Sequence, residues 1–325
     1  MNSRLAFAGT LAAMLWLLSA PRASGQERSG QVRDDETTKV DVSRLEQSAG
    51  RGDAIAACQL GRSYMMGTGV AQDYRQAAKW YRQAAAQGSA DAEFALGYLY
   101  EQGKGVERDY RRAVEHYLAA AKQGHPTAEN NLASMYQHGQ GVRRDLHEAA
   151  RWYQAAAQKG EVTAECNLAS MYFTGKGVAR SYSQAAEWFR AAADKGDPTA
   201  QENLAWMYYT GTGLNRDYAQ AEKWVRRSAE QGSARAQLDL GYLYDQGKGV
   251  PLDYVSAYMW YNAARAGGDK RAAARLKALS QVMTPEQVAT ATERAAQLQV
   301  SRPGATEGDT TNTIGSGFIS GSKKQ

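Results

Sequence analysis

The chain has 325 residues, 43% of them hydrophobic and 22% charged, and a mean hydropathy of −0.60. This composition disfavours an integral membrane protein, a β-rich sandwich and a large apolar core, and it favours many short helices that each bury a narrow stripe. The net charge of +5 is small and evenly mixed, which argues against a nucleic-acid partner, and two cysteines are too few for a disulfide framework or a four-ligand zinc site.

Residues 1–25 have the features of a secretory signal peptide. Arg4 supplies a positive charge, residues 5–18 form an apolar run, and small residues precede a cleavage site that we place after Gly25. Because the run is shorter than the roughly 20 residues of a spanning helix, we expect no membrane span after cleavage and a periplasmic or secreted protein. An uncleaved, membrane-anchored start is the alternative. Residues 26–39 are polar and predict a flexible lead-in.

A repeat of 36 residues then dominates the sequence. A leucine and a tyrosine precede each Gly-x-Gly pair by seven and three residues, and the register never drifts. The first glycines of the six pairs are Gly67, Gly103, Gly139, Gly175, Gly211 and Gly247. Six units therefore cover residues 53–268.

Each unit predicts a hairpin of two helices. The first helix follows an N-cap residue such as Asp53 and stops at the first glycine of Gly-x-Gly, whereas the second follows a residue such as Asp73 and ends at a glycine such as Gly88. An isolated pair of such helices buries too little surface to fold, so neighbouring pairs must stack. The sequence therefore predicts an all-α solenoid.

Both ends of the array look like caps. Residues 40–52 match a second helix without its first, and residues 269–299 begin like a first helix without its second. Thr284 to Gln287 form a capping box with Pro285 at the first helical position, which predicts a last helix to about Leu298. Residues 300–325 are rich in Gly, Ser and Thr and predict a disordered tail.

The second unit shows the repeated residues in full: Ala92, Leu96, Gly97, Tyr100, Gly103, Lys104, Gly105, Val106, Asp109, Tyr110, Ala113, Tyr117, Ala120 and Ala121. This pattern resembles the Sel1-like repeat, a relative of the tetratricopeptide repeat. The resemblance covers about residues 40–280. It implies a right-handed α-α superhelix of six 36-residue helical hairpins that serves as an adaptor for protein partners. Exported bacterial members are often linked to envelope signalling, surface-polymer regulation or host contact.

The sequence offers little catalytic or metal-binding chemistry. The histidines lack a second ligand one helical turn away, so we interpret them as solvated or packing residues. They are His116, His125, His138 and His147. Gly139-Gln140-Gly141 lacks the third glycine of a dinucleotide loop and follows a predicted helix instead of a strand. We therefore predict a protein that is not an enzyme and has no metal or cofactor.

Cys58 and Cys166 occupy the same position in units three repeats apart. Stacked helices would hold them roughly 25 Å apart, beyond the ~7 Å limit of a disulfide. We interpret both as small packing residues, with an intermolecular bridge as the alternative. The pattern by which some exported relatives staple each repeat with a cysteine pair is missing, so any activity of those relatives is not transferred.

A short segment of the tail, residues 315–320, resembles the opening strand of trypsin-like peptidases of the high-temperature-requirement type. No catalytic residue follows it before the chain ends at Gln325. A truncated peptidase fusion and a plain low-complexity tail are both compatible with it.

The resemblance also indicates where a partner would bind, because the first helices line the concave face of tetratricopeptide-like solenoids. Aromatic rings at these positions suit interaction hot spots, and recurring asparagines suit a grip on a peptide backbone. The predicted partner-binding residues are Phe94, Tyr98, Asn131, Asn167, Phe173, Asn203, Trp206, Tyr209 and Tyr242. The alternatives are that the aromatics pack on a neighbouring repeat and that the asparagines satisfy backbone groups.

We therefore predict an exported scaffold that binds a protein or peptide partner in the cell envelope or outside the cell, in envelope signalling or regulation. A peptidoglycan- or polysaccharide-binding envelope protein is the second hypothesis, since aromatic platforms with amides also suit sugars. The third is the targeting arm of a truncated peptidase fusion.

Overall fold

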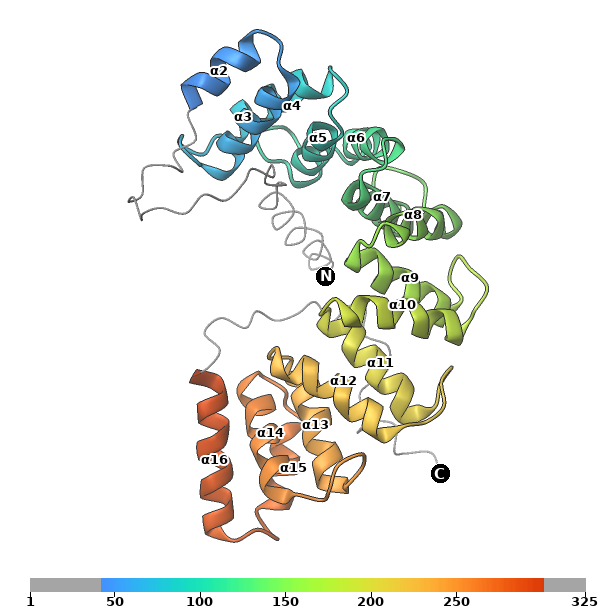
Figure 1. Cartoon of the computed structure of the whole chain (residues 1–325), viewed down its shortest axis with the longest axis vertical. Helices are drawn as coiled ribbons and strands as arrows, with labels where there is room; N and C mark the ends of the chain where they lie inside the picture. The colour runs from blue at the N-terminus through green and yellow to red at the C-terminus, as the bar shows by residue number, and fades with distance from the viewer. Residues whose placement is uncertain (1–41, 301–325) are drawn as a thin grey trace, which may run out of the picture. The chain divides into compact units, whose positions relative to one another are not determined.

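The computed structural model describes residues 42–300, and all regular structure in this range is helical (Figure 1). The chain divides into two compact units, Met1–Glu161 and Val162–Gln325, called unit 1 and unit 2 below. The described helices of unit 1 are α2 (Val42–Gly50), α3 (Ala54–Met66), α4 (Tyr74–Ala85), α5 (Ala90–Gln102), α6 (Tyr110–Lys122), α7 (Pro126–His138) and α8 (Leu146–Gln158). Those of unit 2 are α9 (Val162–Thr174), α10 (Tyr182–Asp194), α11 (Pro198–Thr210), α12 (Tyr218–Glu230), α13 (Ala234–Gln246), α14 (Tyr254–Ala266), α15 (Ala272–Leu279) and α16 (Pro285–Val300).

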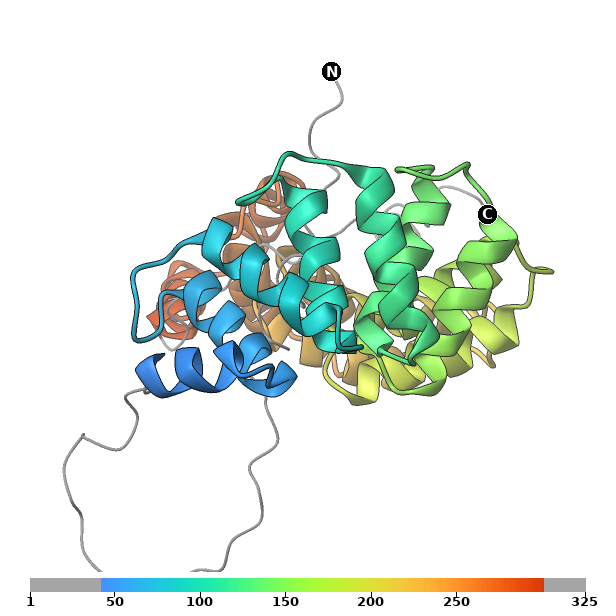
Figure 2. The same cartoon turned by 90° about the horizontal axis from the view of Figure 1, so that it is seen from above.

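The helices pair as the sequence predicts. In unit 1 each helix packs on the next, from α2 through α8, and Figure 2 shows these helices side by side. In unit 2 the same succession runs from α9 to α14. The first helices of the repeats are α3, α5, α7, α9, α11 and α13, and the second helices lie between and after them. The predicted all-α array of helical hairpins is confirmed.

The predicted caps form. The Asp53 carboxylate accepts hydrogen bonds from the backbone N–H groups of Ile55 and Ala56 at 2.9 and 3.2 Å, and Asp73 does the same at the start of α4. The second helices end two or three residues before the predicted glycine, as α4 does at Ala85. The reason is that Gly88 takes a φ of +83°, which turns the next N–H back onto the carbonyl of Ala84.

Each core combines alanines with large rings. Tyr81, Tyr117, Tyr153 and Phe189 are fully buried on second helices, while alanines on both helices permit close packing. A Cβ at Gly97 would lie 2.6 Å from the Tyr117 ring, so the first helix approaches the ring closely there.

Polar pairs inside single repeats tie the first helix to the end of the second. The buried carboxylates of Glu129 and Glu165 each lie 2.5 Å from a lysine ammonium, on Lys159 and Lys195 respectively. The following repeat carries glutamine at both places, and Gln231 donates to Gln201 at 2.9 Å. The charged pairs and the neutral pair thus link the same two helices within a repeat. Each also gives a hydrogen-bonding partner to a polar group that would otherwise be buried alone.

The ends of the array are covered by single helices. α2 packs on α3, and both α15 and α16 pack on α14. The predicted capping box at Thr284 is confirmed, since Thr284 and Gln287 exchange backbone-to-side-chain hydrogen bonds at 2.9 and 3.3 Å. α15 begins three residues later than Asp269, because the Asp269 carboxylate accepts the N–H of Arg271 and holds a turn there. Between residues 42 and 300 no helix combines the length and apolarity needed to cross a bilayer.

Candidate functional site

In unit 2 the predicted aromatic residues form a row across three successive first helices. Phe173 of α9 lies edge-on to Trp206 of α11, with ring centroids 5.7 Å apart, and Tyr209 of α11 lies 6.4 Å from Tyr242 of α13. Phe173, Trp206 and Tyr209 are half-buried. These four residues are called the aromatic row below. Trp206 and Tyr209 are neighbours on one helix face because they are three residues apart.

A lysine from the loop after α13 sits on this row. The Lys248 ammonium donates a hydrogen bond to the Tyr209 hydroxyl at 2.9 Å. It also lies 5.1, 5.6 and 5.5 Å from the ring centroids of Tyr209, Tyr218 and Tyr242, which are cation–π distances. Partial burial acts to lower the pKa of Lys248, but the hydrogen bond to Tyr209 and the charge interactions with Tyr209, Tyr242 and Tyr218 together outweigh it, and the pKa is raised. The ammonium is therefore charged at neutral pH.

Tyr242 is contacted by a second cation. The Arg275 guanidinium of α15 lies 5.3 Å from the Tyr242 ring centroid and 3.7 Å from the carboxylate of Asp245. With these neighbours Tyr242 is only 5% exposed. The prediction that Tyr242 presents an exposed ring is therefore wrong, because two long side chains from outside α13, Lys248 of the following loop and Arg275 of α15, pack on the ring.

Unit 1 repeats the lysine arrangement. The Lys104 ammonium donates to the Tyr98 hydroxyl at 3.2 Å and lies 5.2 and 5.4 Å from the rings of Tyr74 and Tyr98. Tyr98 is only 4% exposed, so its predicted exposure is also wrong. Position 104 corresponds to position 248 four repeats later, so the packing of a loop lysine against tyrosine side chains recurs in both units. This arrangement is called the tyrosine seat of the lysine below.

Phe94 is not on the surface at all. Its ring is fully buried, stacked on His125 with centroids 4.6 Å apart and 5.9 Å from Tyr117. The prediction of an exposed Phe94 is wrong, because the N-cap of the next repeat closes over it. Burial lowers the pKa of His125 to about 4, and the neutral ring accepts the N–H of Ala128 at 3.2 Å.

The asparagine row is mostly internal. Asn203 is fully buried and Asn131 is 7% exposed, with Asn131 accepting a hydrogen bond from Asn130 at 3.3 Å. The burial of these two amides favours the structural alternative over a grip on a peptide backbone. Asn167 is half-buried, and its contact with a partner stays a prediction.

Other reactive side chains have structural surroundings. His116 lies 2.6 Å from the carboxylate of Glu93 and stacks on Tyr100. Cys58 is half-buried, and burial raises the pKa of its thiol to about 11, while Cys166 is buried. Within residues 42–300 no three His, Cys, Asp or Glu side chains gather as metal ligands would. An intermolecular disulfide stays untested.

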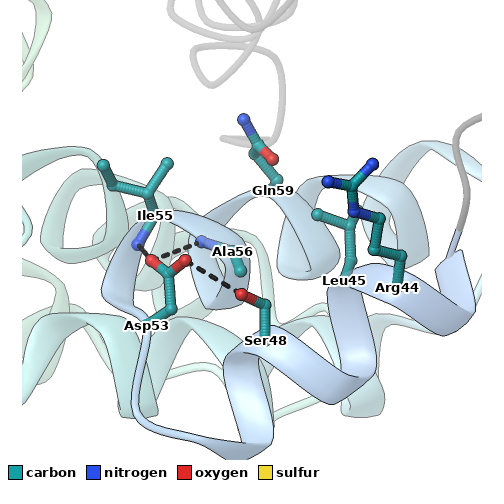
Figure 3. A pocket seen from close by; sticks show the side chains of 7 residues that line it. All are labelled: Arg44, Leu45, Ser48, Asp53, Ile55, Ala56 and Gln59. Atoms are coloured by element: carbon teal, nitrogen blue, oxygen red, sulfur yellow. Dashed lines mark hydrogen bonds between the residues drawn. The ribbon is translucent and has the colours of Figure 1, made fainter.

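A hollow of about 370 Å³ lies between α2 and the start of α3 (Figure 3). Its polar centre, Asp53, accepts hydrogen bonds from two backbone N–H groups and from Ser48 at 3.1 Å. Arg44, Leu45 and Ile55 also line it. The Asp53 carboxylate is thus engaged in capping α3.

Sequence reasoning missed the residues that complete the site, namely Lys104, Lys248 and Arg275. A signal for the lysines was present, because Gly-Lys-Gly recurs and a tyrosine stands six residues before each of these two lysines. No comparable signal marks Arg275, which reaches Tyr242 from a different helix.

The Sel1 repeat family matches residues 54–89, 90–125, 126–161, 162–197, 198–233 and 234–269. A search of curated proteins found no significant match.

The solved structures similar to this chain include two with the following identity and coverage. One is a protective antigen present in uropathogenic Escherichia coli strains that displays an SLR fold, with 35% identity, a TM-score of 0.74, and coverage of 79% of this chain and 56% of that one. The other is a Sel1 repeat protein from Oxalobacter formigenes, with 36% identity, a TM-score of 0.65, and coverage of 73% and 68%. This chain thus spans little more than half the length of the E. coli protein. Six tandem matches and these two structures show that the chain belongs to the Sel1 repeat family.

Proposed function

We propose that this chain is an exported scaffold that binds a protein or peptide partner on the surface of its first helices and acts in envelope signalling or regulation. Sel1-repeat proteins are generally protein-interaction scaffolds. The signal-like residues 1–25 support export. The scaffold role requires no chemistry of its own, only a surface on which a partner can be held.

The aromatic row is the observation that carries this proposal. Phe173, Trp206 and Tyr209 are large, half-buried rings on neighbouring first helices, and Lys248 adds a charge beside them. Rings that are already held by packing lose little entropy on binding, which is why Tyr and Trp are enriched in hot spots. A surface assembled from three successive repeats favours an extended segment over a small molecule.

The test is recovery of envelope proteins by the full mature chain and by the variant Trp206→Ala/Tyr209→Ala. We expect the variant to recover the wild-type partner at least tenfold less well, because hot-spot truncations cost about 2 kcal/mol or more each. Circular dichroism checks that helicity is kept, and Tyr209→Ala alone serves if the double variant unfolds.

The matched control is Trp188→Ala, which removes a half-buried tryptophan from the second helix α10. It should recover the partner as the wild type does. Equal recovery by all three proteins would contradict binding on the first-helix surface.

The saccharide-binding alternative has lost part of its basis, because Asn131 and Asn203 are buried and offer no amide to a sugar. Sedimentation with purified peptidoglycan tests it, since a protein adaptor should remain in the supernatant. The segment that motivates the peptidase-arm alternative, residues 315–320, lies outside the described residues.

A further inference from the structure

Lys104 and Lys248 differ from the lysines that tie the repeats together. Lys159 and Lys195 each lie 2.5 Å from a buried carboxylate. In contrast, no carboxylate within residues 42–300 lies within 4.0 Å of the ammonium of Lys104 or Lys248, whose neighbours are tyrosines. The tyrosine seats therefore hold these two charges in place without neutralising them.

Such a seat leaves the ammonium able to bind an anion. An ammonium has three N–H donors, and Lys248 uses one of them on the Tyr209 hydroxyl. The rings of Tyr209, Tyr218 and Tyr242 restrict the side chain, so less conformational entropy remains to be lost when an anion binds. The remaining donors lie beside the aromatic row, of which Tyr209 is half-buried.

We propose that Lys248 anchors an acidic side chain, aspartate or glutamate, of a partner segment that lies along the aromatic row, and that Lys104 offers the same anchor in unit 1. This inference rests on the proposed function and adds the chemical class of the partner, an acidic and partly apolar peptide segment.

The surroundings favour a single carboxylate over a phosphate or a polyanion. The nearby helix α14 has its first N–H groups capped by the Asp253 carboxylate at 3.0 and 3.1 Å, so they are not available to a phosphate and the cap is itself negative. Arg275, the other cation at Tyr242, already faces Asp245. One compact ammonium beside apolar rings matches one carboxylate, whereas phosphate recognition commonly uses several donors or an arginine fork.

The chain contains a matched control. Lys176 stands at the same place in its Gly-x-Gly loop, but its repeat has Ser170 where the others have Tyr98 and Tyr242. Lys176 is exposed, and within the described part of the chain its ammonium makes no hydrogen bond, ion pair or ring contact. Lys176 therefore has the same charge as Lys104 and Lys248 but no tyrosine side chains that hold it in place.

The experiment probes an array of random twelve-residue peptides with the labelled full mature chain and with the variants Lys248→Gln, Lys248→Arg and Lys176→Gln. We expect the peptides that bind the wild type to be enriched in Asp and Glu. Lys248→Gln should bind them about tenfold more weakly, the loss of one charge-assisted hydrogen bond. Lys248→Arg should keep most of the binding, and Lys176→Gln all of it.

The outcomes separate this inference from the proposed function. Peptides that bind without acidic enrichment, or bind Lys248→Gln as well as the wild type, would overturn the acidic anchor and leave peptide binding standing. Equal losses in Lys248→Gln and Lys248→Arg would assign Lys248 a packing role and overturn it too. Tighter binding of labelled polyphosphate with the same dependence on Lys248 would replace the carboxylate by a polyanion. An array without any binder would contradict the proposed function itself.

Discussion

At the scale of single residues, the structure separates rings that fill space from rings that a partner can reach. Phe94 and Trp206 occupy related first-helix surfaces, yet Phe94 is fully buried under His125 whereas Trp206 is half-buried. The repeat pattern predicts the helix face of each residue. It does not predict its exposure, which depends on whether the residue that follows in the next repeat or loop is long enough to cover it.

His125 leads to a prediction about pH. Burial and the charge of Lys159 lower its pKa to about 4, although the Asp91 carboxylate 3.8 Å from Nε2 favours the charged form. The cost of burying a charged imidazolium outweighs its attraction to that single, partly exposed carboxylate. Because the ordinary pKa of about 6.5 applies in the unfolded chain, unfolding binds a proton between these values. The contribution to stability is complete above pH 6.5 and is lost as the pH falls towards 4.

We expect proton uptake by His125 in the unfolded chain to lower the free energy of unfolding by about 2 kcal/mol between pH 7 and pH 5. His125→Asn keeps a good N-cap but cannot take up the proton, so urea unfolding of this variant should depend less on pH than that of the wild type. The comparison cancels groups such as Glu202, whose pKa is raised by burial and which act in the opposite direction. Parallel pH profiles for the two proteins would refute the assignment.

At the scale of elements, the second glycine of Gly-x-Gly sets how closely neighbouring repeats pack. Gly105 has a φ of +69°, and a Cβ there would overlap the backbone carbonyl of Tyr74 at the start of α4 in the preceding repeat. Gly141 and Gly249 meet Tyr110 and Tyr218 in the same way. The loop of one repeat is thus pressed on the helix of the previous one, which explains why the pair recurs without drift.

Gly105→Ala should therefore destabilise unit 1 by about 3 kcal/mol or more, combining left-handed strain with overpacking against backbone. Gly88→Ala is the control, because Gly88 has a φ of +83° but nothing within 4 Å of the added methyl group. It should cost only about 1–2 kcal/mol. Thermal unfolding followed by circular dichroism compares the two, and equal losses would mean that the close approach contributes nothing.

At the scale of the whole molecule, stability comes from contacts between neighbouring helices, as expected for a repeat array. This is why so much of the fold could be read from the sequence: the 36-residue period placed the helices, and Asp53, Gly67 and the Thr284 box marked their ends. The site could be predicted only in part. Tyr98 and Tyr242 were correctly placed on first helices, but their cover comes from loop and α15 side chains whose positions depend on tertiary packing.

Hydrogen exchange shows whether a partner binds on the first helices of the array. The full mature chain is compared alone and with the partner that it recovers from the envelope, and exchange is followed by mass spectrometry along the chain. We expect slower exchange on partner binding in the first helices of unit 2, α9, α11 and α13, and in the loop that carries Lys248. Slower exchange confined to the second helices α10, α12 and α14 would contradict it.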